Sequence, residues 1–242
     1  MQRILVTGAS GAIGQAIARR LAASGASLYL HFNTAEQKAR TLADDLATQY
    51  PNQDFLCIQA NLARSEGVSA LLKQLAFTVD GLVYNCGKSD VGLFQDVPAS
   101  ALQQAVQLAL ISPFQIAQRL IDPMISARFG RIIFISSIWG LTGAAVEVLY
   151  SMVKGGQISL VKALAKETAS SGITVNAVAP GAVDTPMLSC YSAEELKQVA
   201  EEIPAGRLAQ PDEIAAAVQF LVSRDAAYIN GQVLSVNGAW YC

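Results

Sequence analysis

The feature that most constrains the fold is a series of seven short apolar runs, separated by segments long enough to hold a crossover helix. Continuous apolar runs are typical of parallel strands, because helices cover both faces of a parallel sheet. The predicted strands are 3-6, 27-32, 54-58, 80-84, 131-136, 173-178 and 232-236. The predicted helices are 12-24, 35-49, 65-76, 99-126, 148-170 and 212-223. The sequence therefore predicts an α/β fold in which a seven-stranded parallel sheet is flanked by helices on both faces.

Length and charge narrow the class of protein. A chain of 242 residues suits one α/β domain, so we expect a single domain over 1-242. A net charge of −2 lacks the basic excess of nucleic-acid-binding proteins, and we expect no nucleic-acid partner. No apolar stretch approaches the ~20 residues that span a bilayer, and no charged leader precedes the strand-forming residues at Ile4. We therefore expect a cytoplasmic protein with no membrane partner.

The cysteines and the single histidine suggest no metal site. Cys57, Cys86, Cys190 and Cys242 are far apart, without a Cys-x-x-Cys pair, and His31 is the only histidine. Neither a zinc site nor a disulfide framework is indicated, so we expect buried, reduced thiols. His31 is interpreted as an ordinary residue at a strand end rather than a catalytic one.

The first predicted strand leads directly into a glycine-rich turn, Gly8-Ala-Ser-Gly-Ala-Ile-Gly14, and a helical pattern follows. Glycines let the backbone turn tightly and approach a pyrophosphate, and the amides at the start of the helix point at the anion. The predicted ligand is therefore a dinucleotide. The candidate binding residues within this turn are Gly8, Ser10, Gly11, Ile13 and Gly14.

Tyr150 and Lys154 are four residues apart in a predicted helix, so the phenol and the ammonium project from one face. Ser137 lies thirteen positions before Tyr150. Hydride addition to a ketone leaves charge on the oxygen, which requires a proton donor and a second hydrogen-bond donor. Tyr150 suits the first role, Ser137 suits the second, and Lys154 favours the phenolate. These three residues predict a carbonyl reductase.

Together these motifs resemble the short-chain dehydrogenase/reductase family, in which Thr-Gly-x-x-x-Gly-x-Gly opens the chain and Ser, Tyr and Lys form the catalytic core. Tyr84-Asn-Cys-Gly87 stands where Asn-Asn-Ala-Gly is usual, and Pro180-Gly-Ala-Val-Asp-Thr185 matches the Pro-Gly-x-x-x-Thr segment beside the nicotinamide. The resemblance spans nearly the whole chain and implies a single-domain Rossmann fold. The further cofactor-binding residues that it implies are Asn33, Thr34, Asn61, Leu62, Asn85, Gly87, Tyr150, Lys154, Pro180, Gly181, Val183 and Thr185.

Three positions depart from the family pattern. Ala12 stands at a family glycine, and glycine has moved to position 11, where many members that prefer NADP carry arginine. Asn61 replaces the acidic residue that meets the adenine, although an amide can still make that hydrogen bond. Ala109 stands at the fourth catalytic residue, an asparagine that anchors a water relay to the lysine. Proton resupply is therefore an open question, and a catalytically weak nucleotide-binding scaffold or redox sensor is the alternative of another class.

The choice of cofactor depends on the residues after the second predicted strand. An acidic residue there would bond both ribose hydroxyls and repel a 2′-phosphate. Asn33 and Thr34 carry no charge and can donate to a phosphate instead. We expect NADP(H) in preference to NAD(H).

The segment 229-238 looks like the last strand of the bacterial 3-oxoacyl-acyl-carrier-protein reductases. The first substrate hypothesis is therefore a 3-oxoacyl thioester, either as a small molecule or bound to a carrier protein. An acidic carrier protein would need a basic patch near the site entrance, for which Arg128, Arg131 and Lys162 are candidates. Solvated surface charge explains these three residues equally well.

The segment 138-149 and the ending 237-242 also look like the reductases linked to elongation factor P, which reduce a 5-aminopentanone group on a protein lysine. Trp139 and Glu147 are the candidate residues of the substrate pocket, and Glu147 could pair with the ammonium of such a substrate. The alternative for Glu147 is a carboxylate favoured by the helix dipole.

The resemblance also implies a substrate lid and an assembly. Residues 186-207 resemble the family's mobile lid, with an ordinary surface helix pair as the alternative. A homotetramer is implied, with interfaces built from the helices 99-126 and 148-170 and the last strand. The apolar ending at Trp240 and Tyr241 fits burial against a neighbouring subunit.

Overall fold

The computed structural model describes residues 2–89, 91–189 and 191–242, and its centre is a parallel sheet. The strands are β1 Arg3–Val6, β2 Ser27–Phe32, β3 Phe55–Gln59, β4 Gly81–Tyr84, β5 Gly130–Ile135, β6 Ile173–Pro180 and β7 Val233–Val236. They lie in the order β3-β2-β1-β4-β5-β6-β7, and every neighbouring pair is parallel. The predicted seven-stranded parallel sheet is confirmed, because each apolar run forms a strand.

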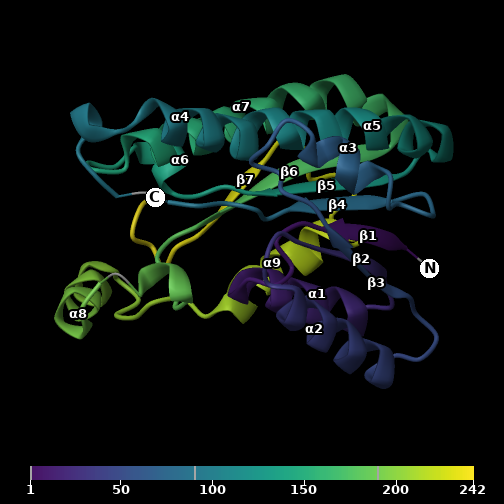
Figure 1. Ribbon diagram of the computed structural model, residues 1–242, viewed down its shortest axis with the longest axis horizontal. Helices are drawn as coiled ribbons and strands as arrows, with labels where there is room; N and C mark the ends of the chain where they lie inside the picture. The colour runs from purple at the N-terminus through teal and green to yellow at the C-terminus, as the bar shows by residue number, and fades with distance from the viewer. Residues whose placement is uncertain (1, 90, 190) are drawn as a thin grey trace.

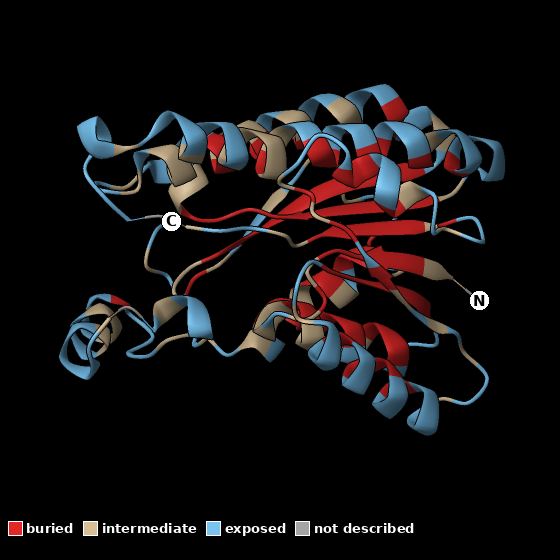
Figure 2. Ribbon diagram, viewed as in Figure 1, coloured by how far each residue is buried: buried red, intermediate tan, exposed pale blue. Residues whose placement is uncertain are grey.

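Helices cover both faces of the sheet (Figure 1). The helices of one layer are α1 Ala12–Ala23, α2 Glu36–Gln49 and α9 Pro211–Val222. The helices of the other layer are α3 Gly67–Leu72, α4 Ala99–Val106, α5 Ser112–Ala127 and α7 Val148–Thr168. One apolar core forms beneath each layer, so the inner strands are buried, whereas the edge strands β3 and β7 are partly exposed (Figure 2). This two-sided burial explains why the strands are continuous apolar runs.

The long predicted helix 99-126 is interrupted in the structure. A π-helical turn, Gln107–Ile111, separates α4 from α5. The cause is Pro113, which has no N–H to donate to the carbonyl of Ala109 four residues earlier, and whose ring would collide with that carbonyl in a regular helix. The wider turn avoids the collision, and π-helical turns of this kind are frequent at functional sites.

The remaining helical elements are short. The helix predicted over 65-76 is limited to Gly67–Leu72, and α6 Trp139–Thr142 was not predicted as a separate helix. α8 Ala193–Glu202 lies in the segment 186-207, for which a lid or a surface helix pair was expected. In the described part of the chain, 3₁₀ turns also occur at Phe94–Asp96, Ala169–Ser171 and Pro186–Leu188.

Two of the three candidates for a basic patch, Arg128 and Arg131, do not lie near the site entrance. Arg131 is only 3% exposed, because its guanidinium donates to the Gly130 carbonyl and packs 4.5 Å from the ring centre of Phe129. Arg131 and Arg128 lie at the amino end of β5, whereas Ser137 follows its carboxyl end. The length of the strand therefore separates these cations from the predicted catalytic residues.

The thiols are only partly as predicted. Cys57 and Cys86 are free and half-buried, but Cys242 is exposed at the end of the chain, so its predicted burial is wrong. Cys190 lies outside the described residues. Within the described ranges, no group of His, Cys, Asp and Glu side chains could hold a metal ion, and no helix could cross a membrane.

His31 is more than an ordinary strand-end residue, because its ring links three segments beneath the glycine turn. Its side chain is 1% exposed, and Nε2 lies 3.1 Å from the carbonyl of Ala60, after β3. A carbonyl can only accept, so Nε2 carries the hydrogen and Nδ1 accepts from the Gly8 N–H at 3.1 Å. Only the neutral ring satisfies both contacts, and burial lowers the pKa of His31 to about 4.

Gly14→Ala is expected to destabilise the fold. An added Cβ at this position would meet the Gly8 carbonyl oxygen at 2.1 Å and the Ala9 Cα at 2.9 Å, and neither backbone atom can move aside. We expect a loss of about 1–3 kcal/mol in unfolding free energy, measured by denaturant or thermal unfolding. Gly11→Ala is the matched control, because its Cβ would meet only the Gly8 oxygen at 3.4 Å. Equal stability of the two variants would contradict the close approach at Gly14.

The unfolding free energy is expected to fall as the pH is lowered from about 6.5 to about 4. In this range the imidazole of His31 binds a proton in the unfolded chain but stays neutral in the folded protein. The loss should reach roughly 3 kcal/mol, and His31→Asn should lack this component between pH ~6.5 and ~5. The single imidazole can also be followed by NMR, where it should carry its hydrogen on Nε2. An imidazole that titrates near its ordinary pKa would refute the buried neutral ring.

Candidate active site

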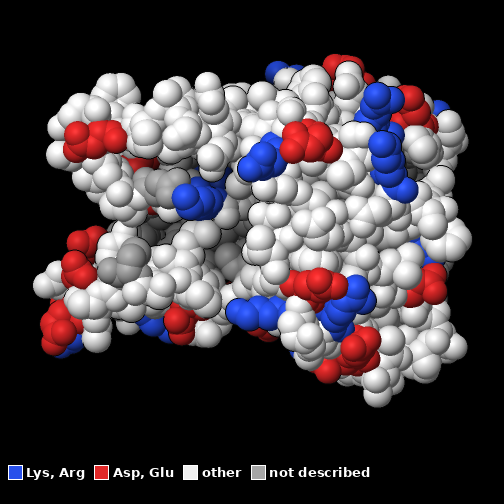
Figure 3. Space-filling model, viewed as in Figure 1, with Lys and Arg blue, Asp and Glu red and all other residues white. Residues whose placement is uncertain are grey.

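The predicted functional residues converge at one edge of the sheet. The glycine turn follows β1, Asn33 and Thr34 follow β2, and Asn61 and Leu62 follow β3. The remaining residues continue this arrangement: Asn85 and Gly87 follow β4, Ser137 follows β5, and Gly181, Val183 and Thr185 follow Pro180 at the end of β6. The carboxyl ends of parallel strands share one edge, where ligands of open α/β sheets bind. Figure 3 shows the surface hollowed on this side, between the layer that ends in α4 and α6 and the part that contains α8.

The glycine turn is held by the strand beside it. Gly8 has a φ of +65°, which glycine adopts without strain. The Asn85 side-chain amide donates to the Gly8 carbonyl at 3.2 Å, and the Asn85 backbone N–H donates to Thr7 Oγ1 at 3.0 Å. Gly14 allows the first turn of α1 to contact the Gly8 backbone. The turn is therefore fixed from both sides.

The turn and the residues near it fit a dinucleotide. Gly11 precedes α1 and has no side chain to cap the helix, and no acidic residue stands in the first turn, so the helix start suits a pyrophosphate. Asn33 and Thr34 are exposed after β2, and neither carries charge. Asn61 is half-buried, and its Oδ1 accepts from the Ala63 N–H at 3.1 Å. The Leu62 side chain is 2% exposed, which leaves its backbone as the part that could reach a ligand.

The three predicted catalytic side chains come from β5 and α7. Ser137 is 7% exposed just after β5, while Tyr150 and Lys154 lie one turn apart near the start of α7. Lys154 is 3% exposed, and its Nζ lies 5.5 Å from the ring centre of Tyr150. The Lys154 ammonium donates to the Ile135 carbonyl at 2.7 Å. The end of β5 and the first turns of α7 are thereby joined at the site.

Burial separates the proton affinities of Tyr150 and Lys154. Burial raises the pKa of Tyr150 to about 12, a hydrogen bond with Ser137 lowers it, and the charge of Glu147 raises it further. Burial lowers the pKa of Lys154 to about 8. Burial therefore holds Tyr150 as a protonated phenol at neutral pH, and the stabilisation of the phenolate by Lys154 stays a prediction.

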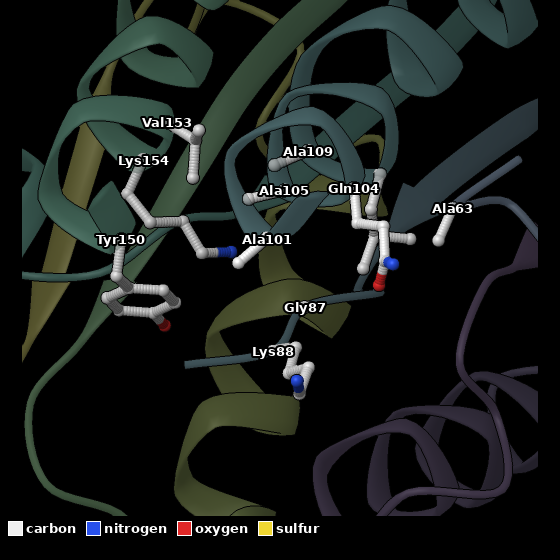
Figure 4. A pocket seen from close by; sticks show the side chains of 11 residues that line it. Ala63, Gly87, Lys88, Ala101, Gln104, Ala105, Ala109, Tyr150, Val153 and Lys154 are labelled. Carbon is white, nitrogen blue, oxygen red and sulfur yellow. The ribbon is translucent and has the colours of Figure 1, made fainter. Parts of the chain in front are cut away.

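A cavity of about 50 Å³ lies beside these residues (Figure 4). Tyr150 and Lys154 line it from α7, and Gly87 and Lys88 line it from the loop after β4. The other lining residues are Ala63, Ala101, Gln104, Ala105, Leu108, Ala109 and Val153. This volume can hold one or two water molecules. Ala109 thus faces the same space as Lys154, where the family's asparagine would stand.

The predicted substrate residues both lie close to this site. The Trp139 backbone N–H donates to Ser137 Oγ at 3.2 Å, and its ring lies 5.3 Å from Trp240 and 5.5 Å from Tyr241 between ring centres. The apolar ending therefore packs on Trp139 within its own chain, and its burial against a neighbouring subunit stays a prediction. Glu147 immediately precedes α7, and its carboxylate accepts from the Ser89 hydroxyl.

Two further residues shape the site, and sequence reasoning missed both. An added Cβ at Gly140 would meet the Lys154 carbonyl carbon at 2.7 Å, so glycine lets α6 approach α7 closely. Gln157 is fully buried one turn after Lys154. The available signal was an amide among the apolar residues Val153, Ile158 and Val161.

Comparisons with known proteins extend these observations. A family model described as Enoyl-(Acyl carrier protein) reductase matches residues 8–240. The chain is 49% identical over 239 residues to Uncharacterized oxidoreductase YmfI of Bacillus subtilis (strain 168), with 98% of each chain covered. It is 36% identical over 240 residues to 3-oxoacyl-acyl-carrier-protein reductase FabG of Aquifex aeolicus (strain VF5), covering 98% of this chain and 96% of the relative.

A solved structure agrees with this relationship. The angucycline C-6 ketoreductase LanV with bound NADP superposes with a TM-score of 0.89 at 28% identity, covering 98% of this chain and 94% of LanV. The sequence matches begin at the glycine turn and continue past β7, through every strand end that carries a candidate residue. The chain therefore belongs to the short-chain dehydrogenase/reductase family of oxidoreductases.

Proposed function

We propose that the protein is an NADP(H)-dependent carbonyl reductase whose substrate is a 3-oxoacyl thioester. The observation that carries the reductase chemistry is the meeting of Ser137, Tyr150 and Lys154 at the strand edge that also holds the glycine turn. The 36% identity to a 3-oxoacyl-acyl-carrier-protein reductase over nearly the whole chain supports the substrate class.

The glycine turn and the strand ends would hold the cofactor. The amides at the start of α1 would bind the pyrophosphate, and Asn61 would meet the adenine. Asn33 and Thr34 would donate to a 2′-phosphate, which favours NADP(H), and the relative LanV was solved with bound NADP. The residues after β4 and β6 would lie beside the nicotinamide, namely Asn85, Gly87, Pro180, Gly181, Val183 and Thr185. When bound, the reduced nicotinamide supplies the hydride.

The side chains of Ser137, Tyr150 and Lys154 would bind and protonate the ketone oxygen. Tyr150 would donate the proton, which its raised pKa keeps on the phenol at neutral pH. Ser137, hydrogen-bonded to Tyr150, would donate a second hydrogen bond and fix the carbonyl oxygen. Lys154, mostly protonated at pH 7 and close to the Tyr150 ring, would stabilise the phenolate that remains after the transfer.

A second candidate substrate is a ketone that bears an ammonium group, such as a 5-aminopentanone group on a protein lysine. The observation that favours it is a carboxylate and an aromatic cluster beside the catalytic side chains. Glu147 acts electrostatically on Tyr150, and the Trp139 ring packs with two further aromatic rings next to Ser137. Carboxylates and aromatic faces both attract cations.

The alternative of a redox sensor or nucleotide-binding scaffold receives less support. Burial raises the pKa of Cys86 to about 11, so little reactive thiolate forms there at neutral pH. Ser137, Tyr150 and Lys154 are also intact and close together, despite Ala109. A protein that only binds a nucleotide does not require these three catalytic side chains at one site.

The lid and the assembly complete the proposal. The lid would comprise 186-207, where α8 has no buried residue among those described and stands apart from the sheet layers (Figure 1). A homotetramer is supported by exposed apolar side chains on the helices that the family uses for its interfaces. These side chains are Leu102 on α4, Phe114 and Ile125 on α5, and Met152 on α7.

The substrate proposal is tested by following NADPH and NADH oxidation with a short 3-oxoacyl thioester and with an amino-ketone of the 5-aminopentanone type. We expect thioester reduction that is faster with NADPH. Reduction of the amino-ketone alone would favour the second candidate, in which case Glu147→Gln should slow that substrate more than a neutral ketone. Tight NADPH binding without turnover of either ketone would contradict the proposed reductase function.

Tyr150→Phe is expected to lower the rate of ketone reduction by a factor of about 10² to 10⁴, because the variant lacks the proton donor. NADPH binding, measured by fluorescence titration, should be largely retained. Tyr228→Phe is the control, because that side chain is fully exposed. Reduction at the parent rate by Tyr150→Phe would remove the proposed mechanism.

A further inference from the structure

Gln157 links the buried ammonium of Lys154 to the π-helical turn. Its side chain is 0% exposed within α7. Its Nε2 donates to the Ala109 carbonyl at 2.9 Å, and its Oε1 accepts from Lys154 Nζ at 3.4 Å. Both ends of a buried amide are therefore paired, one of them with a proposed catalytic residue.

The polarity of the two partners fixes the orientation of this amide. The Ala109 carbonyl can only accept a hydrogen bond, so it must face the NH₂ group of Gln157. The ammonium of Lys154 can only donate, so it must face Oε1. A side chain without both a donor and an acceptor could not connect these two groups.

The Ala109 carbonyl is available because of the helix break. Pro113 has no N–H to offer it, and the Ser112 N–H is directed to Gln107 in the π-helical turn. The neighbouring Leu108 carbonyl accepts from the hydroxyl of Tyr84, a second side chain that satisfies this turn. Gln157 and Tyr84 thus supply donors that the backbone of the turn lacks.

The hydrogen bond from Lys154 to Gln157 is one of two that the buried ammonium makes among the contacts of the described residues. The ammonium has a second acceptor in the Ile135 carbonyl, at 2.7 Å, and its side chain lines the cavity. Three titratable groups accompany it there: Tyr150 on its own helix, Cys86 after β4, and Lys88, which lines the same cavity. Glu147 acts on the adjacent Tyr150.

We propose that Gln157 is a positioning residue, which holds the Lys154 ammonium in the place of the asparagine that Ala109 has replaced. The proposal rests on the role of Lys154 in the proposed reductase function. The amide makes a direct hydrogen bond to the lysine from α7 and ties it to the same backbone position, Ala109, at which the family's asparagine would stand.

The test compares Gln157→Met, which keeps a similar size without the amide, with the parent in pH profiles of ketone reduction. Loss of an acceptor destabilises the buried ammonium, so we expect kcat to fall roughly tenfold or more at an almost unchanged KM for the ketone. The alkaline limb of kcat should also move to lower pH, because Lys154 loses its proton more readily. Gln157→Glu should move that limb to higher pH, because a carboxylate attracts the ammonium.

Thr168→Val is the matched control, since Thr168 is a buried polar residue of α7 whose hydroxyl donates within its own helix, to the Leu164 carbonyl. It should leave the pH profile unchanged. An unshifted limb in Gln157→Met, or an equal shift in Thr168→Val, would overturn the proposal. If the methionine variant does not fold, an unshifted limb in Gln157→Glu overturns it instead. Activity that depends on Tyr150 while both Gln157 variants keep the parent profile would reject Gln157 and leave the reductase function standing.

Discussion

The buried ammonium of Lys154 is the constraint on which the site depends. A charge that is 3% exposed is tolerated only where acceptors replace the lost water. The acceptors here come from two directions, the Ile135 carbonyl at the end of β5 and the side-chain oxygen of Gln157. The Ser136 hydroxyl also donates to the Lys154 backbone carbonyl at 3.0 Å. These bonds hold α7 against the end of β5, and the positions of Tyr150 and Ser137 follow from that contact.

The helix break and the lysine contact are parts of one arrangement. A regular helix over 99–127 would direct its carbonyls along its own axis and offer none to α7. Pro113 prevents this geometry, and the freed carbonyls then require donors from outside the helix. Tyr84 and Gln157 provide those donors from β4 and α7. With alanine in place of the family's asparagine, the backbone carbonyl of position 109 is still present. The group that connects this carbonyl to Lys154 is the side chain of Gln157.

The sequence was informative where local patterns decide the structure. Apolar runs located all seven strands, and each motif that follows a strand had to reach the same sheet edge. It was misleading where a contact joins distant segments. Arg131 is charged but buried, because Phe129 and backbone carbonyls surround it. The Trp139 ring meets Trp240 about a hundred residues later in the chain, which no periodicity could predict. Gln157 was detectable in the sequence as a polar residue among apolar ones. Its partners were not, because its bond to the Ala109 carbonyl depends on a helix break that was not predicted.

Burial is the largest cause of the pKa shifts of the two titrating groups of the site, and it shifts them in opposite directions. It raises the pKa of the phenol, whose charged form is the anion, and lowers the pKa of the amine, whose charged form is the cation. The values of about 12 and about 8 still leave both groups protonated at neutral pH. A protonated phenol can give a proton to a ketone oxygen, but the transfer leaves a phenolate that burial disfavours, so this anion needs a positive charge nearby. Lys154, which is also protonated, lies where it can stabilise that phenolate, and in the proposed arrangement Gln157 supports this role because its oxygen stabilises the charged form of the lysine.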